Sequence, residues 1–295
     1  MTPEALDASL TSAVQRRRRL AAMSFGSRLV SEPRMAALSL SAAVLTRCGC
    51  SLRHRTRTFW GGEMTVALPE AVSSEIARFG YIEEPVARAL IAHVRPGDVV
   101  LDVGGHFGFF SLLAAELVGP QGQVHTFEPV PATFGVLSGN AQGKPITVNN
   151  LAVWNCAHTI AIQDYGLSLS AFNSVRTPRL KNGSGRAPTI HQIPAVTLDD
   201  YTAARTLRPS FAKIDAESAE YEVLQGMQRV IAECRPVICL ELGDVGVADA
   251  VKSRELVEWL IAHGYAPLEW SGKGFVSHQL KADYAYTNLL FAPRG

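Results

Sequence analysis

The chain has 295 residues, of which 47% are hydrophobic and 19% charged, and its formal net charge is +1. This length is typical of one large α/β domain with an extension, or of two small domains. A net charge near zero gives no reason to expect a nucleic acid as a partner. No apolar run approaches the roughly 20 residues of a membrane helix, so we expect a cytoplasmic protein without a membrane partner.

The N-terminal part of the chain differs in composition from the rest. Residues 4–47 are rich in Ala, Leu, Ser and Arg and predict two or three short helices. Residues 1–60 contain ten arginines and three acids, including the run Arg16–Arg19. These arginines form either a solvated helix face or a docking surface for a partner or for phosphate groups. We predict that residues 1–58 are a helical extension that caps the domain or forms a homodimer.

A regular alternation of strands and helices follows in residues 59–295. The Gly61-Gly62 pair predicts a hairpin turn, and residues 73–93 are predicted to be helical with breaks near Gly80 and Pro85. Further on, predicted strands cover 99–103, 123–127, 146–148, 211–215 and 237–242, and predicted helices cover 107–118, 131–140, 217–233 and 249–263. Residues 265–270 and 288–291 predict an antiparallel pair at the sheet edge. The pattern indicates an α/β protein with a Rossmann-like, doubly wound sheet.

One segment interrupts this alternation. Nearly sixty residues separate Ala152 from Phe211, where a single helix would suffice. Connections this long usually have a function. We therefore predict that the insertion 153–210 lies over the ligand crevice and contacts the substrate, as a substrate arm. Within it, Asn173 and Ser174 are candidates for orienting a polar acceptor. The histidines His158 and His191 could also reach a substrate, although loop histidines usually have no such role.

The cysteines indicate neither a disulfide framework nor a metal site. Five cysteines are scattered along the chain, which is typical of a reducing compartment. Cys48-Gly49-Cys50 with His54 nearby lacks a second ligand pair, so we predict no bound metal.

The strongest signal is a glycine turn after the strand 99–103. That strand carries Asp102 and runs into Gly104-Gly105-His106-Phe107-Gly108, and the next strand ends at Glu128. In an open parallel sheet such a turn approaches an adenosine ligand, and the second acid binds the ribose hydroxyls. A dinucleotide fingerprint would have Gly at position 106, so the spacing favours S-adenosylmethionine over NAD. An NAD-dependent oxidoreductase stays an alternative.

Two residues of this crevice are candidates for catalysis. Asp215 ends the fourth strand, and its side chain is expected at the same crevice unless Lys213 or a backbone N–H binds it. His106 could act as a base, could bind the donor carboxylate, or could be a spacer. Glu217 and Glu220 begin the next helix, where acids also stabilise the helix dipole. A base assists methyl transfer when the acceptor is a hydroxyl.

Several motifs in this order resemble the FkbM family of S-adenosylmethionine-dependent methyltransferases over residues 64–292. They are residues 97–104 (GDVVLDVG), 127–129 (FEP), 197–201 (TLDDY), 213–217 (KIDAE) and 288–291 (NLLF). The resemblance implies a seven-stranded class I methyltransferase sheet and O-methylation of sugar or natural-product hydroxyls. It implies a donor at the glycine turn and Glu128, with Asp215 beside the transferred methyl. The chain departs from the family by having Gly105-His106 in place of Ala-Asn, and Ser218 in place of Gly.

We therefore expect a methyltransferase that acts on a small molecule at a hydroxyl. N-methylation of a small molecule or peptide side chain and a non-catalytic binding module are the remaining alternatives. The predicted catalytic residues are Asp215 and His106. The residues predicted to bind the donor are Glu83, Asp102, Gly104, Gly105, His106, Phe107, Gly108, Glu128, Pro129, Ala152 and Asp215, and those predicted to bind the substrate are Asn173, Ser174 and Glu217.

Overall fold

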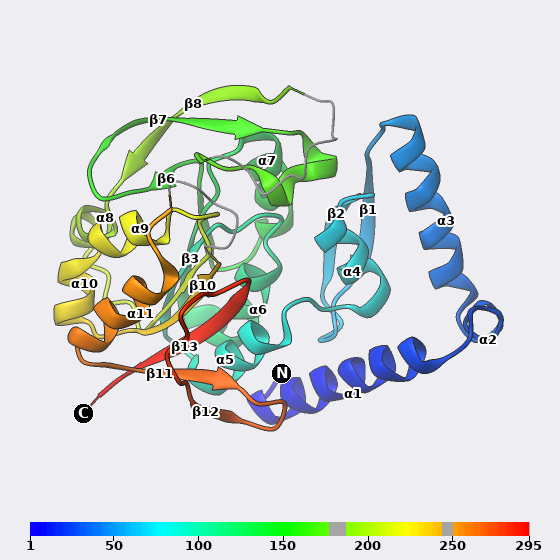
Figure 1. The fold of residues 1–295 in the computed structure, drawn as a ribbon, viewed down its shortest axis with the longest axis horizontal. Helices are drawn as coiled ribbons and strands as arrows, with labels where there is room; N and C mark the ends of the chain where they lie inside the picture. The colour runs from blue at the N-terminus through cyan, green and yellow to red at the C-terminus, as the bar shows by residue number, and fades with distance from the viewer. Residues whose placement is uncertain (177–186, 244–249, 295) are drawn as a thin grey trace.

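The fold is that of a computed structural model, which describes residues 1–176, 187–243 and 250–294. Its main sheet has five parallel strands: β3 (Val99–Val103), β4 (Gln123–Phe127), β5 (Ile146–Asn149), β9 (Phe211–Ile214) and β10 (Val237–Leu242). Three antiparallel strands complete it: β11 (Tyr265–Trp270), β12 (Phe275–Ser277) and β13 (Thr287–Pro293). The strand order is β12-β11-β13-β10-β9-β3-β4-β5 (Figure 1).

This order confirms the predicted α/β class and adds one strand to the expected seven. The extra strand, β12, arises because the chain reverses directly after β11. Ser271 N–H donates to the Gly274 carbonyl at 3.0 Å, and Gly272 has a φ of +88° within this turn. The reversal pairs Phe275 with Trp270, so β12 rather than β11 is the sheet edge.

Helices cover both faces of the main sheet. One face carries α4 (Ala71–Phe79), α5 (Glu84–His93), α6 (Phe109–Val118) and α7 (Pro131–Ala141), and η1 (Gly119–Gln121) follows α6. The other face carries α8 (Leu198–Ala204), α9 (Glu220–Gln225), α10 (Gln228–Glu233) and α11 (Ser253–Ala262). Alternate residues of one strand enter different cores: Val100 packs on the first face, whereas Leu101 packs on the second. Burial on both faces explains the nearly unbroken apolar strands.

The predicted helix 217–233 is wrong in its continuity, because the structure has two short helices there. A Cβ on Gly226 would lie 2.1 Å from the Trp154 carbonyl oxygen, so the chain passes too close to that carbonyl for any larger residue. After this break the helix starts again, and the Asp199 carboxylate accepts the N–H groups of Arg229 and Val230 at 3.0 and 2.9 Å. A side-chain cap of this kind supplies the partners that the first turn of a helix lacks.

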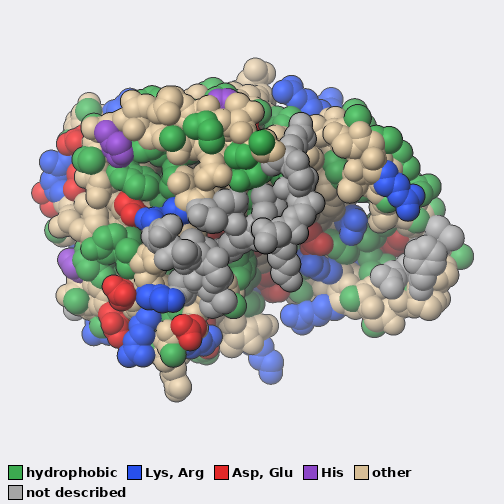
Figure 2. All heavy atoms as spheres, turned by 45° about the horizontal axis from the view of Figure 1, so that its top comes forward, with side chains coloured by type: hydrophobic (Ala, Val, Ile, Leu, Met, Phe, Trp, Pro, Cys, Tyr) green, Lys and Arg blue, Asp and Glu red, His purple; other side chains and the backbone are tan. Residues whose placement is uncertain are grey.

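The N-terminal residues form α1 (Pro3–Ala22), α2 (Phe25–Ser31) and α3 (Pro33–Cys48), followed by the hairpin of β1 (Leu52–Arg57) and β2 (Glu63–Leu68). The hairpin turn contains Gly61 and Gly62, as predicted. α1 buries Leu6, Leu10 and Val14 against the first core, whereas α3 has no buried residue. Figure 2 shows basic side chains on the part of the surface that this extension forms.

The insertion forms its own small sheet above the carboxyl ends of the parallel strands (Figure 1). Its strands are β6 (Ala152–Val153), β7 (His158–Asp164) and β8 (Thr189–Val196), in the order β6-β8-β7, and η2 (Leu167–Phe172) follows β7. Residues 177–186 of the predicted arm lie outside the described residues, as does residue 249 of the predicted helix 249–263. Among the described helices, none has the length and apolar character that are needed to cross a membrane.

Candidate active site

A cavity of about 340 Å³ lies where β3, β4, β9 and β10 end, beneath the insertion. The glycine turn and the acids after the strands predict a ligand at this edge of the sheet. Among the lining residues are these twelve, all predicted to bind donor or substrate: Glu83, Gly104, Gly105, His106, Phe107, Glu128, Pro129, Ala152, Asn173, Ser174, Asp215 and Glu217. Two other predicted donor-binding residues, Asp102 and Gly108, do not line the cavity.

The glycines of the turn are required by close contacts within the protein. Gly104 has a φ of +75°, and a Cβ there would lie 1.8 Å from the Asp215 carbonyl oxygen. A Cβ on Gly105 would lie 2.2 Å from Thr126 Cγ2, and one on Gly108 would lie 2.5 Å from Leu137 Cδ1. The turn is therefore packed tightly against β4, α7 and the end of β9, and this packing brings its backbone to the cavity wall.

Asp102 lies beneath the turn rather than in the cavity. It is 2% exposed, and Ser111 Oγ donates a hydrogen bond to its Oδ2. Burial raises the pKa of Asp102, and the ammonium group of Lys213 opposes that rise at 3.7 Å. Its partners Ser111 and Lys213 belong to α6 and β9, and Lys213 in turn donates to the Gly104 carbonyl of the glycine turn.

Lys213 contacts both Asp102 beneath the glycine turn and Asp215 at the cavity. The buried ammonium group lies 3.0 Å from Asp215 Oδ2 and donates to the Gly104 carbonyl oxygen at 2.9 Å. Burial favours the neutral amine, but the carboxylates of Asp215, Asp102 and Glu83 outweigh it and raise the pKa of Lys213. Lys213 thus stays charged and fixes the orientation of Asp215, whose side chain still lines the cavity.

Glu128 ends β4 and is 6% exposed. Its two carboxylate oxygens accept the N–H groups of His106 and Val130, each at 3.0 Å. Each oxygen has a further lone pair, so the carboxylate can still accept ribose hydroxyls. Burial raises the pKa of Glu128 to about 8. A ligand that donates to this carboxylate would therefore stabilise its charged form.

His106 connects the glycine turn to the insertion. Its backbone has a φ of +50°, and its Nε2 lies 2.7 Å from Ser170 Oγ in η2. Burial lowers the pKa of His106, so the imidazole is neutral at neutral pH. A neutral imidazole can accept a proton, which keeps the predicted role as a base chemically feasible.

Glu83 closes the cavity from the start of α5. Its carboxylate accepts hydrogen bonds from Tyr286 Oη and Asn288 Nδ2, both at 3.1 Å. Burial and the Asp215 carboxylate raise the pKa of Glu83 to about 7. These bonds connect the C-terminal strand β13 and the segment before it to this side of the cavity.

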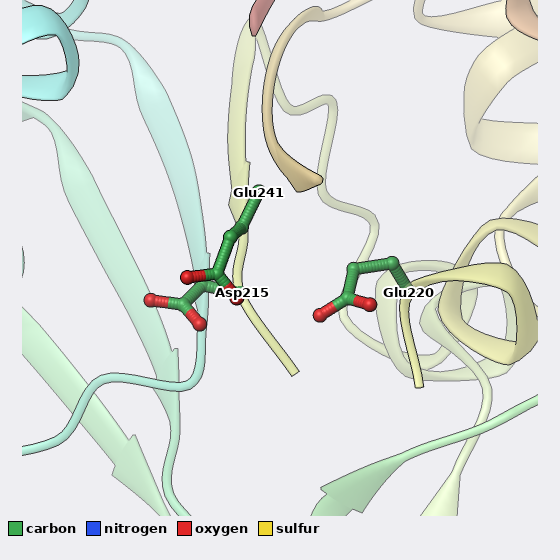
Figure 3. A group of neighbouring side chains, drawn as sticks. All are labelled: Asp215, Glu220 and Glu241. Atoms are coloured by element: carbon green, nitrogen blue, oxygen red, sulfur yellow. The ribbon is translucent and has the colours of Figure 1, made fainter. Parts of the chain in front are cut away.

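Asp215, Glu220 and Glu241 lie together at the end of β9 and β10, and the Glu220 carboxylate points toward the other two (Figure 3). One carboxylate oxygen from each lies within 4.8 Å of the others, an arrangement that could hold a hard cation. Burial raises the pKa of Glu220 to about 7, and burial with the Asp215 charge raises the pKa of Glu241 well above its usual value. Because these pKa values are raised, the acids can also lie close together by keeping a proton instead of binding a cation. The prediction of no metal stays a prediction.

The insertion contributes two of the three predicted substrate residues, Asn173 and Ser174, and the third, Glu217, follows β9. Ser174 Oγ donates to the Glu217 carbonyl oxygen at 2.9 Å, and Asn173 Oδ1 accepts the Tyr165 N–H at 2.8 Å. The histidines His158 and His191 do not line the cavity. His158 is exposed, and His191 pairs with Asp164 at 3.1 Å.

Several lining residues were missed by the sequence analysis. Glu241 stands near the end of the buried strand β10, so the rule that selected Asp215 would have selected it as well. Ser170 lies in the short helix η2 and Tyr286 in an irregular segment, and neither stretch has a periodic signal in the sequence. Lys213 was considered as a partner of Asp215, and the structure shows that pair.

Comparison with known proteins agrees with this architecture. Residues 102–267 match the family described as the methyltransferase FkbM domain. The chain is similar to the 31-O-demethyl-FK506 methyltransferase FkbM of Streptomyces tacrolimicus, with 30% identity over 222 residues that cover 66% of this chain and 84% of that protein. It is also similar to the hexuronic acid methyltransferase AglP of Haloferax volcanii, with 28% identity over 161 residues that cover 53% of this chain and 61% of that protein.

Among solved structures, the chain is similar to a methyltransferase FkbM from Methylobacillus flagellatus KT, with a TM-score of 0.44 and 17% identity. That match covers 71% of this chain and about half, 48%, of the other. The family match spans more than half of the present chain and includes Asp102, Glu128, Lys213 and Asp215. The chain therefore belongs to the FkbM methyltransferase family.

Proposed function

We propose that this protein transfers a methyl group from S-adenosylmethionine to a hydroxyl of a small molecule, such as a sugar or a natural product. The observation that carries the proposal is the cavity at the ends of the parallel strands, lined by the glycine turn, Glu128 and Asp215 in a chain of the FkbM family. The two relatives named for hexuronic acid and for demethylated FK506 support an oxygen acceptor.

The lining residues suit this donor. Glu128 has free acceptor positions for two ribose hydroxyls, and apolar side chains such as Phe127, Leu151 and Val153 offer walls for a purine ring. Toward β10, the carboxyl groups of Glu83, Asp215 and Glu241 surround the cavity. Burial raises the pKa of Glu83 and of Glu241, and a positively charged ligand beside them would stabilise their ionised forms. S-adenosylmethionine supplies an activated methyl group on a positively charged sulfur, so these carboxylates complement its charge.

An acceptor hydroxyl needs a group that takes its proton as the new bond forms. Asp215 is held by Lys213 at 3.0 Å and lines the cavity, so it is in place to accept that proton. His106 is the second candidate, because its imidazole is buried and neutral. The remaining contribution of the chain is to hold the reactants in line in a cavity that excludes water.

The proposal is tested by supplying S-adenosylmethionine with a trideuterated methyl group and a panel of sugars, polyketides and amines. Mass spectrometry is expected to detect a labelled product whose methyl is on oxygen. A labelled amine, with no labelled hydroxyl in any product, would contradict O-methylation and favour the N-methylation alternative.

A further inference from the structure

The turn Ala216–Ser218, which we call the acid turn, has an unusual backbone next to the cavity. Glu217 has a φ of +49° and Ser218 a φ of +76°, although neither residue is glycine. Left-handed backbone is unfavourable for a residue with a Cβ and persists only where surrounding contacts enforce it. Ala216 and Glu217 line the cavity, so the strain is located in its wall.

One set of contacts comes from below the acid turn. Glu220 is 8% exposed, and its Oε1 accepts the N–H of Ala216 at 2.8 Å and that of Ser218 at 3.2 Å. Glu220 begins α9, so this side of the acid turn is fixed by the helix that follows it. These bonds hold the two amides but not the carbonyls.

The carbonyls of the acid turn are held by the insertion. Ser174 Oγ donates to the Glu217 carbonyl at 2.9 Å, and Arg176 Nε donates to the Ser218 carbonyl at 2.7 Å. The guanidinium group of Arg176 also pairs with Glu222 of α9, and both side chains are largely buried, at 16% and 14% exposed. Arg176 is not among the described residues that line the cavity, and its side chain reaches the cavity wall through the acid turn.

The acid turn also lies next to the glycine turn. The Asp215 carbonyl lies where a Cβ of Gly104 would stand, and Asp215 N–H donates to the Val103 carbonyl at 3.2 Å. A shift of the acid turn would therefore displace Asp215 and the backbone of Gly104 together. We infer that Arg176 of the insertion is a positioning residue, which holds the strained acid turn in the conformation that binds the donor.

The test uses Ser218→Gly to remove the strain at position 218 and Arg176→Ala to remove the contact with the Ser218 carbonyl. Glycine adopts a φ of +76° without a steric penalty, so Ser218→Gly should make the acid turn less dependent on Arg176. In calorimetric titrations with S-adenosylmethionine, we expect Arg176→Ala to raise the donor Kd about tenfold. Ser218→Gly alone should stay within about threefold of wild type, and the double variant should return to that range.

Arg254→Ala is the matched control, because it removes another Arg–Glu pair, from the exposed side of α11. It should leave the donor Kd unchanged. A wild-type Kd in Arg176→Ala, or an undiminished loss in the double variant, would overturn the inference. If Arg176→Ala does not fold, Arg176→Lys replaces it, since lysine keeps the charge beside Glu222 but loses the second donor group.

This titration rests on the proposed function, so hydrogen exchange of the Ala216 and Ser218 amides provides an independent measurement. Without any ligand, Arg176→Ala should speed their exchange about tenfold, and Ser218→Gly should restore protection. A wild-type protein that does not bind the donor would refute the proposed function and leave this exchange test valid. Unchanged exchange in Arg176→Ala would refute the positioning role.

Discussion

At the scale of single residues, the site depends on one buried cation among several acids. Lys213 contacts Asp102 in β3, Asp215 at the cavity and the Gly104 carbonyl of the glycine turn. Without it, the buried carboxylate of Asp102 and the partly exposed one of Asp215 would lose this positive charge, which is most unfavourable for the buried group. Burial also raises the pKa of Glu128 to about 8 and that of Glu220 to about 7.

The first residue-scale prediction concerns Asp215→Asn. The amide keeps the size of the side chain but cannot accept a proton from an acceptor hydroxyl. We expect kcat for methyl transfer to fall about 100-fold or more, while the donor Kd changes by less than about tenfold. Asp283→Asn, on an exposed segment, is the control. An unchanged kcat in Asp215→Asn would show that Asp215 has no catalytic role.

The second residue-scale prediction concerns pH. Burial raises the pKa of Glu128 to about 8, so between its unfolded value of 4.5 and 8 the folded protein binds more protons than the unfolded chain. Stability of the ligand-free protein should therefore decline as the pH rises from about 5 to about 8. Glu128→Gln, which does not titrate, should show a smaller decline in Tm over this range. An equal decline in both proteins would contradict the raised pKa.

At the scale of elements, the parallel strands could be predicted well because their burial leaves a continuous apolar run with defined ends. β3, β4 and β10 match the predicted bounds residue for residue. The broken helix after β9 could not be predicted, since the cause is the Trp154 carbonyl, which is distant in sequence from Gly226. The site residues differ in the same way. Glu128 and Asp215 directly follow strands, so the strand pattern locates them. Ser170 comes close to His106 only because the insertion folds over the glycine turn.

A pair of glycine substitutions tests this explanation of the break between α9 and α10. Gly226→Ala would place a Cβ 2.1 Å from the Trp154 carbonyl and should destabilise the protein by about 1–3 kcal/mol. Gly135→Ala is the matched control inside α7, where a Cβ would have no heavy atom within 4 Å. It should stabilise the protein by about 0.5–1 kcal/mol. Denaturant unfolding measures both, and similar effects would contradict the explanation.

At the scale of the whole molecule, the N-terminal extension has two parts with different relations to the domain. α1 buries three side chains in the first core, whereas α3 leaves Leu40 and Val44 exposed at 68% and 49%. Ten of the 28 lysines and arginines of the chain lie in residues 1–60. A homodimer through these helices stays a prediction, for which light scattering in solution is the measurement.

The different packing of α1 and α3 predicts different costs of truncation. Leu10→Ala removes a side chain that is 0% exposed, so it should lower the free energy of unfolding by about 2–5 kcal/mol. Leu40→Ala should change it by less than about 0.5 kcal/mol in a monomeric sample. Equal effects of the two substitutions in denaturant titrations would contradict the packing of α1 on the core.

The account depends most on donor binding in the cavity above β3, β4 and β9. Isothermal titration calorimetry with S-adenosylmethionine tests it directly, with wild type and Glu128→Gln compared at the same pH. We predict one site per chain in the wild type and a Kd at least about tenfold weaker in Glu128→Gln, because a charged acceptor for ribose hydroxyls is lost. Absence of binding to the wild type, or equal affinity in the two proteins, would contradict the account.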